Sequence, residues 1–307
     1  MDVTQVYKAM SDETRLRILH ALNLCSLNVQ ELQKVIGVGQ SNISHHLKIL
    51  ENAGILKHKS EGTANFYHLP QNEDSLASNV TSGFISIVGS NLNGLTKILL
   101  RDKESVNNLI EKRREAARAY FDSVAPKWKE IREEIVNSRS YLKNIQAEIS
   151  DDGTLLEMGC GSGILLAELL PRKGETIGVD YSPAMLEEAK QNLALNKVDL
   201  RLGYLEHLPV PDSSIDIALC HMVLHHLDDP KNALADSLRV LKPSGKLLVV
   251  DLTSHANENM RERYADRWLG FDPKDFKIWL ESLHFKNIEI SILGENNKVF
   301  LIKGMKT

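Results

Sequence analysis

The sequence predicts an α/β protein in two parts: a small N-terminal helical domain ending in a β-hairpin, and a larger domain around a mostly parallel sheet. Two short helical patterns joined by glycines, followed by two β-type runs, indicate the first part. From Thr154 onward strand and helix patterns alternate, which is typical of a doubly wound sheet. A chain of 307 residues is long enough for two hydrophobic cores.

Composition and charge exclude some classes of protein. The net charge of -4, from 37 basic and 41 acidic residues, neither favours nor excludes nucleic acid, because a whole-chain sum mixes domains. The distant cysteines Cys25, Cys160 and Cys220 form no disulfide framework and predict a reducing cytoplasm. We find no secretory leader and no apolar run that could span a bilayer, so we expect a soluble protein with no membrane partner.

The first part carries a helix-turn-helix pattern. In DETRLRILHAL, leucines recur at helical spacing after Ser11, the predicted N-cap. NVQELQKVIG repeats the pattern, Gly37-Val38-Gly39 interrupts it, and QSNISHHLKIL restarts it. In the restarted helix the predicted buried stripe is Ile43, Leu47 and Leu50, and the polar stripe is Ser41, His45, Lys48 and Asn52. His46 lies beside the apolar stripe and is interpreted as a packed or capped histidine.

A hairpin is predicted directly after this helix. Gly54 ends the helix, and the β-type runs ILKHKS and ANFYHL are separated by Glu61-Gly62-Thr63. A hairpin in this place is the plan of a winged helix. Lys57, His58 and Lys59 put hydrogen-bond donors along the wing, where DNA phosphates would lie.

The blocks from KAMSDETRLRIL through QSNISHHLKILENAGIL to the wing closely resemble the ArsR family of bacterial winged-helix repressors. The resemblance implies a homodimer on a near-palindromic double-stranded DNA operator, with the helix Gln40–Asn52 in the major groove. The residues that it places on DNA are Gln40, Ser41, Asn42, Ser44, His45, Lys48, Lys57 and Lys59. The alternative is a winged helix used only for protein contacts.

One feature of the metal-sensing members of that family is missing. They carry a Cys-x-Cys-Asp type cluster at the first helix of the motif, where this sequence has Cys25-Ser26-Leu27-Asn28. A lone cysteine is more often a small buried hydrophobe than a ligand. We therefore expect no arsenic or zinc at this position, and a signal that enters elsewhere in the chain.

The middle of the chain joins the two parts. Gln71–Asp74 is interpreted as a hinge, and helical periodicity with alternating charge runs from Val106 to Ala117. This predicts a long helix that is either a connector or a dimer-contact helix coupling the two ends. We assign residues 1–70 to the winged-helix domain, 71–116 to a linker and dimerisation segment, and 117–307 to the second domain.

The second domain is predicted strand by strand. Strands are expected at Leu155–Met158, Thr176–Asp180, Val198–Leu202, Ile215–Cys220 and Lys246–Leu252. Helices are expected at Ile164–Leu170, Pro183–Asn196 and Ala233–Leu241. At the end, Ile288–Leu293 and Val299–Lys303 flank a glycine-containing turn, so this edge of the sheet is expected to be an antiparallel hairpin.

A glycine-rich loop, Glu157-Met158-Gly159-Cys160-Gly161-Ser162-Gly163, follows the first of these strands. Ligands of such sheets bind at the carboxyl ends of the strands, where glycine lets the backbone approach closely. The third glycine comes one residue earlier than in a dinucleotide-binding loop, and a ligand that carries no phosphate would have less need of a pyrophosphate cradle. Asp180, at the end of the second strand, can accept hydrogen bonds from both ribose hydroxyls of a nucleoside.

Four blocks in order, LLEMGCGSG, IGVDYSPAMLEEA, LEHLPVPDSSIDIALCHMVLHHLDDP and LRVLKPSGKLLVVDL, resemble the Rossmann-like class I methyltransferases. These enzymes use S-adenosylmethionine and have a seven-stranded sheet; AYFDSVAPKW resembles their segment over the cofactor. The residues implied to bind S-adenosylmethionine or S-adenosylhomocysteine are Glu157, Gly159, Gly161, Gly163, Asp180, Tyr181, Met185, Leu205, Glu206 and His221. Many relatives have Asp at the position of Tyr204, so Leu205 and Glu206 are expected to serve the adenine edge.

Three histidines, His221, His225 and His226, follow the fourth strand. Their spacing suits a metal, but no Asp or Cys completes a set in an obvious way, although Asp228 and Asp229 follow. Structural histidines are therefore preferred, no metal is assigned, and a role for His221 or His225 as a base stays open. No catalytic residue is assigned, because the sulfonium donor carries most of the chemistry of methyl transfer.

Two functions fit both parts of the chain. The first is an ArsR-type transcriptional regulator whose methyltransferase-like domain binds an adenosyl ligand as effector, with methyl donation left open. The second is an active small-molecule methyltransferase with a regulatory or dimerising N-terminal domain. Methylation of DNA bases is disfavoured, because CHMVLHH stands where an Asn/Asp-Pro-Pro-Tyr/Phe motif would follow the fourth strand.

Overall fold

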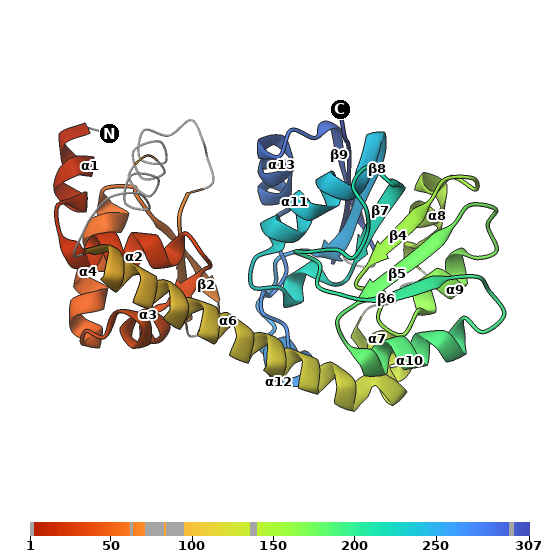
Figure 1. The fold of residues 1–307 in the computed structure, drawn as a ribbon, viewed down its shortest axis with the longest axis horizontal. Coiled ribbons are helices and arrows are strands. Elements are labelled where there is room, and N and C mark those ends of the chain that lie inside the picture. Colours follow the sequence, from red (N-terminus) through yellow and green to blue (C-terminus); the bar gives the residue numbers. More distant parts are fainter. Residues whose placement is uncertain (1–2, 62–63, 71–82, 84–94, 136–139, 295–297) are drawn as a thin grey trace. The chain divides into compact units, whose positions relative to one another are not determined.

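The structure, a computed structural model, describes residues 3–61, 64–70, 83, 95–135, 140–294 and 298–307. The chain divides into two compact units, Met1–Arg114 and Glu115–Thr307. Figure 1 shows a mainly helical first unit and a second unit in which helices lie on both sides of a central sheet. None of the helices in the described ranges is both long enough and apolar enough to cross a membrane.

The first unit is a helix-turn-helix followed by a hairpin, as the sequence predicts. Its elements are α1 Val3–Met10, α2 Glu13–Leu22, β1 Leu27–Asn28, α3 Val29–Ile36, α4 Gln40–Asn52, β2 Lys57–Glu61, β3 Ala64–His68 and the first part of α6 Leu95–Val124. Its core includes the fully buried side chains Ile18, Leu32, Leu47 and Val106, from α2, α3, α4 and α6. Burial of such a side chain stabilises the fold by about 1.5–3 kcal/mol.

The local sequence explains where the helices of this unit begin. The N-cap of α2 is Asp12, whose side chain accepts a hydrogen bond from the backbone N–H of Arg15 at 3.0 Å. The predicted cap, Ser11, is wrong, because its hydroxyl donates to the carbonyl of Lys8 in the preceding turn. Before α3, Asn28 and Glu31 cap each other's backbone N–H groups in a capping box.

The predicted α4 is confirmed at both ends, and so is its buried stripe. Ile43, Leu47 and Leu50 are fully buried, and His46 is buried beside them. Gly37 ends α3 in the left-handed conformation, with φ 78°, which glycine adopts without strain. The turn between the two helices therefore follows from its glycine as well as from the apolar spacing.

The hairpin after α4 is also confirmed. β2 and β3 pair antiparallel from Lys57 opposite His68 to Glu61 opposite Ala64, and β1 pairs with the other edge of β3. Gly62 and Thr63, which were expected to form the turn, lie outside the described residues.

The long helix predicted in the middle of the chain is present as α6, and a buried ion pair ties it to the first unit. Arg17 on α2 donates from Nε and Nη2 to the Asp102 carboxylate at 2.6 and 2.9 Å, and from Nη2 to the carbonyl of Ile36 at 2.7 Å. The Asp102 side chain is fully buried. The hinge expected at Gln71–Asp74 lies outside the described residues.

Replacing Arg17 with methionine is expected to destabilise the first unit by about 3–5 kcal/mol, because it leaves the Asp102 carboxylate buried without its cation. The three tryptophans, Trp128, Trp268 and Trp279, all belong to the second unit. In urea titrations of the full chain, the transition seen by far-ultraviolet circular dichroism should move to lower urea, while tryptophan fluorescence should not. Arg101→Met is the matched control, since Arg101 is exposed and 3.8 Å from Asp102; equal effects of both changes would contradict the prediction.

The second unit begins within α6 at Glu115 and is built around one sheet. Its elements are η1 Ala125–Lys127, α7 Trp128–Ile135, α8 Leu142–Glu148, β4 Leu155–Met158, α9 Ile164–Leu169, β5 Thr176–Asp180, α10 Pro183–Asn192, β6 Asp199–Leu202, β7 Ile215–His221, η3 Leu224–His226, α11 Pro230–Val240, β8 Leu241–Leu252, α12 Asn259–Tyr264, α13 Pro273–Ser282, β9 Lys286–Leu293 and β10 Val299–Met305. The elements η1 and η3 are short 3-10 helices.

The sheet has seven strands in the order β6-β5-β4-β7-β8-β10-β9. The first five strands of this order are parallel, and β10 is antiparallel to both β8 and β9. The predicted mostly parallel sheet with an antiparallel edge hairpin is therefore confirmed. All four residues of β4 are buried, as expected for a central parallel strand covered on both faces.

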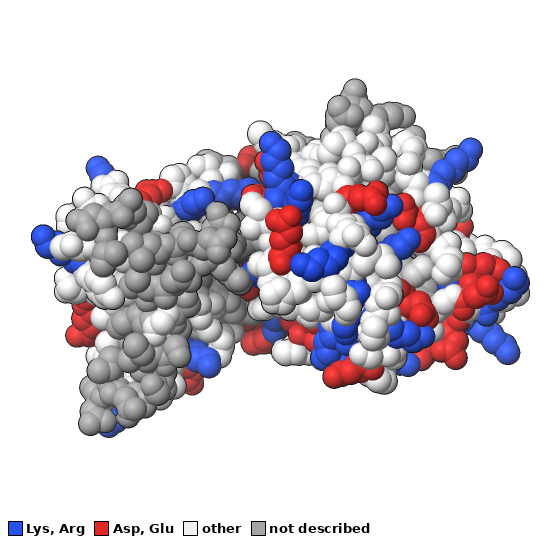
Figure 2. Space-filling view, turned by 90° about the horizontal axis from the view of Figure 1, so that it is seen from above, with Lys and Arg blue, Asp and Glu red and all other residues white. Residues whose placement is uncertain are grey.

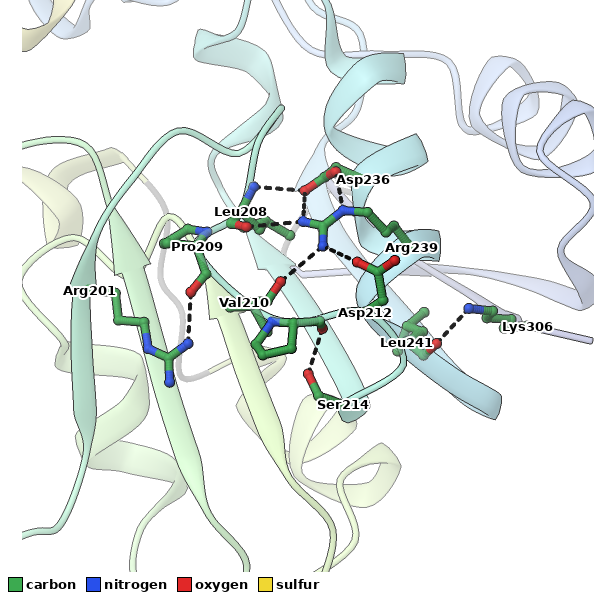
Figure 3. Close-up of polar contacts among 11 residues, drawn as sticks. Arg201, Leu208, Pro209, Val210, Asp212, Ser214, Asp236, Arg239, Leu241 and Lys306 are labelled. Carbon is green, nitrogen blue, oxygen red and sulfur yellow. Dashed lines mark hydrogen bonds and ion pairs between the residues drawn. The ribbon is translucent and has the colours of Figure 1, made fainter.

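A polar cluster around Arg239, at the end of α11, holds the segment that follows β6 (Figure 3). The guanidinium donates to the carbonyls of Leu208 and Val210 at 3.0 and 2.9 Å and pairs with Asp236. Asp236 in turn accepts a hydrogen bond from the backbone N–H of Leu208 at 2.7 Å. Arg239 thereby fixes the path of the loop that begins with residues 204–206, a role that sequence analysis did not assign to it.

Candidate functional site

The glycine-rich loop and Asp180 meet where β4 and β5 end. The two strands run parallel with Met158 opposite Val179, so their carboxyl ends lie side by side. One oxygen of the Asp180 carboxylate accepts a hydrogen bond from the backbone N–H of Gly161 at 2.8 Å, and the other accepts one from Ser182 at 2.9 Å. Gly161 and Asp180, nineteen positions apart in the sequence, are thus joined by a hydrogen bond.

The glycines of the loop have different roles. Gly159 and Gly163 have φ of 78° and 72°, and a Cβ on them would lie 2.4 Å from Val223 and 2.8 Å from Leu193. These two glycines are needed for the loop to pack. Gly161 also has a positive φ, 51°, but a Cβ on it would make only one ordinary contact, with Trp128 Nε1 at 3.6 Å, so the backbone there is less crowded. This is the place where a ligand can approach the main chain.

Two buried carboxylates give the site its electrostatic character. Burial raises the pKa of Asp180 to about 6, although backbone hydrogen bonds from Ser182 and Gly161 oppose the shift. Burial raises the pKa of Glu157 to about 8, with the positive charge of Arg132 opposing it and Asp180 adding to it. Oε2 of Glu157 has no hydrogen-bond partner among the described residues. The site therefore has an acceptor that lacks a donor.

Arg132, on α7, is a charged residue of the site that sequence analysis missed. Its charge acts on Glu157, and its Nη2 atom lies 3.8 Å from Glu168 without a hydrogen-bond partner in the described part of the chain. The pattern WKEIREEI showed a helix but did not distinguish Arg132 from its exposed neighbours. Only the fold brings it beside the glycine-rich loop.

The segment AYFDSVAPKW covers one side of the site. Phe121 of α6 contacts the rings of Trp128 and Tyr181 at 5.5 and 6.2 Å and packs with the buried Met185. Asp122 of α6 accepts a hydrogen bond from the Ser182 hydroxyl at 2.6 Å. The end of α6 is therefore bound to the residues that directly follow β5.

The loop after β6 places an aromatic ring beside Tyr181. Tyr204 stacks on Tyr181, with ring centroids 6.1 Å apart and an interplanar angle of 28°. Leu205 is buried and Glu206 is partly buried beside it. The predicted residues 204–206 and Tyr181 are thus brought together at the carboxyl end of the sheet.

His221 at the end of β7 and His225 are buried, His226 is partly buried, and each of the three has different partners. The Tyr141 hydroxyl and His221 Nε2 are hydrogen-bonded at 3.0 Å, and burial lowers the pKa of His221 well below its usual value. His225 Nδ1 lies 2.5 Å from the Asp251 carboxylate. Burial acts to lower the pKa of His225, but Asp251 and Asp266 raise it to about 9.

His226 and Asp266 complete this group. Burial and the neighbouring His225 lower the pKa of His226 well below its usual value, which favours neutral imidazole. Burial raises the pKa of Asp266 to about 6. The carboxylates near these histidines are Asp251 and Asp266, whereas the sequence had pointed only to Asp228 and Asp229. Asp251 could have been noticed at the end of a predicted strand, whereas nothing local marks Asp266.

A second candidate site is the outer surface of α4. Gln40, Ser41, Asn42, Ser44, His45, Lys48 and Lys57 are exposed, and Lys59 is partly buried. The N-cap of α4 is Gly39, which has no side chain, so the backbone N–H groups of the first turn receive no side-chain hydrogen bond from this position. A cavity of about 590 Å³ lies beside this turn, lined by Gln30, Gln33, Lys34, Gly37, Val38, Gly39 and Gln40. His58 of the wing pairs with Glu51, so its donor is directed back toward α4.

Charge is distributed differently over the second unit. On its face seen in Figure 2, basic and acidic side chains are interspersed and form no extended patch of one sign. Among the described residues, this face offers no continuous basic stripe for a nucleic-acid backbone.

Two family models match the chain. Residues 12–58 match the model described as "Bacterial regulatory protein, arsR family". Residues 156–249 match the model described as "Methyltransferase domain". The first match contains α2 through α4, and the second contains the sheet from β4 into β8 with its glycine-rich loop.

Curated relatives are similar to the second unit. The arsenite methyltransferase of Halobacterium salinarum is 33% identical over 116 residues, which are 36% of this chain and 30% of that protein. The 2-phytyl-1,4-naphtoquinone methyltransferase of Trichormus variabilis is 30% identical over 164 residues, 49% of this chain and 70% of that protein. Apart from the latter, the chain spans about a third to two thirds of the length of such relatives.

A solved structure shares the fold of the second unit. The 1,6-didemethyltoxoflavin-N1-methyltransferase of Burkholderia thailandensis, solved with 1,6-didemethyltoxoflavin and S-adenosylhomocysteine, has a TM-score of 0.53. It is 18% identical, and the match covers 64% of this chain and 90% of that chain.

Proposed function

We propose that this chain, which belongs to the methyltransferase family and carries an ArsR-family regulatory domain, is a DNA-binding transcriptional regulator whose second unit binds an adenosyl effector. The observation that carries the proposal is the continuous helix α6. Asp102 and Val106 of α6 lie in the core of the first unit. Phe121 and Asp122 of α6 lie against the residues that follow β5 in the second.

The cofactor of the second unit is S-adenosylmethionine, with S-adenosylhomocysteine as its demethylated form, and the site fits both. The unpartnered Oε2 of Glu157 suits the ligand's ammonium group, and the nearby guanidinium of Arg132 suits its carboxylate. We propose that Asp180 accepts the ribose hydroxyls through the second lone pair of each oxygen. Tyr181, Met185 and the 204–206 loop would border the adenine, and Gly161 would admit the ligand to the backbone.

We propose that α4 enters the major groove of an operator. Its polar side chains are exposed along the whole helix while its apolar side chains are buried. Lys57 and Lys59 of the wing would then contact phosphates, which position the helix without reading sequence. A homodimer would place two such helices on a near-palindromic site.

Two apolar side chains support the homodimer. Tyr7 on α1 and Leu100 on α6 are each 60% exposed in the first unit. We propose that both side chains are buried in the contact between the two copies. In this proposal residues 71–116 link the units and take part in dimerisation, and α6 passes ligand occupancy to the dimer contact.

A second function, methyl transfer to a small molecule, is favoured by the chain's family and by the buried histidines His221 and His225. Methyl transfer needs a held donor, an aligned acceptor and exclusion of water, and requires no diagnostic catalytic residue. The two functions are compatible, because the same pocket would serve donor and effector.

The regulator function is tested by fluorescence anisotropy on the DNA upstream of the protein's own gene, with each adenosyl ligand added in turn. We expect one ligand to change DNA affinity by more than about tenfold. A complete switch of the protein from 1:99 to 99:1 between two states would need about 10⁴-fold preference of the ligand for one of them. The logarithm of affinity should also fall by about 0.9 per neutralised phosphate for each unit of log salt.

Variants separate the two parts of this test. His45→Ala with Lys48→Ala should weaken DNA binding, whereas Lys274→Ala, which removes a lysine of the second unit, should not. Asp180→Asn should remove the ligand effect and leave DNA binding intact. Indifference of DNA binding to both ligands, together with turnover of S-adenosylmethionine on an acceptor, would favour the enzyme function instead.

A further inference from the structure

Two histidines and a carboxylate form a cluster just beyond β7. His225 and His226 belong to η3, and Asp266 follows α12. One donor atom of each residue lies within 4.8 Å of the others. Oδ1 of Asp266 is 3.7 Å from His225 Nε2 and 3.6 Å from His226 Nδ1. These separations exceed a hydrogen bond and are close to the about 3.4 Å expected between ligands of a tetrahedral ion with bonds of about 2.1 Å. His226 Nδ1 also lies 3.3 Å from the carbonyl oxygen of Ala265, a contact that metal binding would replace.

The Asp266 carboxylate makes no hydrogen bond within the described part of the chain, although His225 and His226 lie within 4 Å of it. The residue is 5% exposed, and neither oxygen has a hydrogen-bond partner among the described residues. A buried carboxylate is unfavourable unless it is paired or coordinates a metal. A protonated His225 would supply positive charge, but at 3.7 Å it gives Asp266 no hydrogen bond. A cation bound directly to the carboxylate would give Asp266 the close contact that it lacks, in addition to the nearby charges of His225 and Arg261.

The fold holds Asp266 firmly beside the two histidines. The backbone N–H groups of Arg267 and Trp268 both donate to the carbonyl of His225 at 2.9 Å. The indole N–H of Trp268 donates to the carbonyl of Leu227 at 2.7 Å. Three hydrogen bonds thus join the segment after α12 to η3 and the residue that follows it. They hold Asp266 close to the two histidines.

Asp251, at the end of β8, orients the first histidine. It lies 2.5 Å from His225 Nδ1 and accepts hydrogen bonds from the backbone N–H groups of Leu224 and Leu252 at 3.1 and 2.7 Å. A carboxylate on one ring nitrogen sets the tautomer that presents the other nitrogen as a ligand. That other nitrogen, Nε2, is the one nearer to Asp266.

We propose that His225, His226 and Asp266 bind one divalent transition-metal ion of the zinc class, with Asp251 as a positioning residue. Two imidazoles and a carboxylate suit Zn²⁺, Co²⁺ or Fe²⁺, and three protein ligands leave a position open to another donor. The His226 ring contacts Phe121 at 4.9 Å, so the ion would lie beside the adenosyl site. This site does not depend on the regulator function, and it replaces the expectation that these histidines are purely structural.

The site is tested by titrating Co²⁺ into the full chain, without a polyhistidine tag and after treatment with EDTA, while recording visible ligand-field absorption. We expect saturation at one Co²⁺ per chain and loss of the band when Zn²⁺ is added. Asp266→Asn and His226→Ala should each lower Co²⁺ affinity by more than about tenfold, and Asp251→Asn by about 10–100-fold. His207→Ala, which changes an exposed histidine of the same unit, should leave affinity unchanged.

The outcomes separate a metal site from an ion pair between His225 and its two carboxylates. Absence of saturable Co²⁺ binding overturns the proposal, and so does equal binding by the Asp266→Asn, His226→Ala and His207→Ala variants. Circular dichroism melting shows which variants are folded. If Asp266→Asn does not fold, His226→Ala decides the question, because His226 lies at the edge of the cluster and is only partly buried.

Discussion

Asp180→Asn is expected to weaken S-adenosylhomocysteine binding by about 100-fold. Both oxygens of the carboxylate accept backbone N–H groups, from Gly161 and Ser182, and we propose that they also accept the ribose hydroxyls. An amide must turn an N–H toward one of these donors, which loses a charge-assisted hydrogen bond and leaves a buried donor unsatisfied. Isothermal titration calorimetry measures the affinity. Asp199→Asn is the control, because Asp199 begins the neighbouring strand β6 and is exposed.

The pH dependence of binding gives this prediction a second test. Because burial raises the pKa of Asp180 to about 6 from an ordinary 3.8, its protonated form accumulates as the pH falls through 6. Affinity for S-adenosylhomocysteine should therefore be constant above that pH and should decrease below it. The decrease should be absent in Asp180→Asn. Unchanged affinity in this variant at neutral pH would remove Asp180 from the ribose site.

Glu157→Gln is expected to weaken binding of the same ligand by about 10–100-fold. Burial raises the pKa of Glu157 to about 8, so the empty site holds it mostly protonated at pH 7. The ligand's ammonium group would favour the carboxylate, and a charge-assisted hydrogen bond in a buried site contributes about 1.5–3 kcal/mol. Glutamine resembles the protonated acid in shape but cannot ionise, so it loses this contribution.

Proton release makes the role of Glu157 measurable independently of affinity. If binding ionises Glu157, the wild-type protein releases a proton at pH 7, and the calorimetric enthalpy should differ between phosphate and Tris in proportion to their ionisation enthalpies. The difference should vanish in Glu157→Gln and persist in Glu187→Gln, an exposed carboxylate on α10. A buffer-dependent enthalpy in both variants would assign the proton to another group.

Helix α4 illustrates what could be predicted from the sequence. Its two ends and its buried stripe were correct, because a helix with one apolar side is encoded by residues three or four positions apart. The cap of α2 was wrong by one residue, since Ser11 and Asp12 can both cap and only the backbone geometry selects between them. The strands of the sheet and its antiparallel edge were likewise predicted from local patterns.

The buried polar groups illustrate what could not be predicted. Arg132 reaches Glu157 from a helix before the sheet, Tyr141 bonds to His221, and Asp266 approaches His225 from beyond the last parallel strand. None of these pairs has a sequence spacing that marks it. Their proximity depends on the packing of elements that are far apart along the chain.

By itself, the sequence determined that the chain has a helix-turn-helix unit and a parallel sheet with a glycine-rich loop. Helix and strand periodicity, turn residues and the blocks shared with known families can each be recognised within a short stretch of sequence. The tertiary structure decided which polar groups share a buried space: the unpartnered Glu157, the doubly bonded Asp180 and the group of His225, His226 and Asp266. The physical reason is that burial and the distance between charges set pKa values and ligand geometry, and both arise only when distant segments pack together.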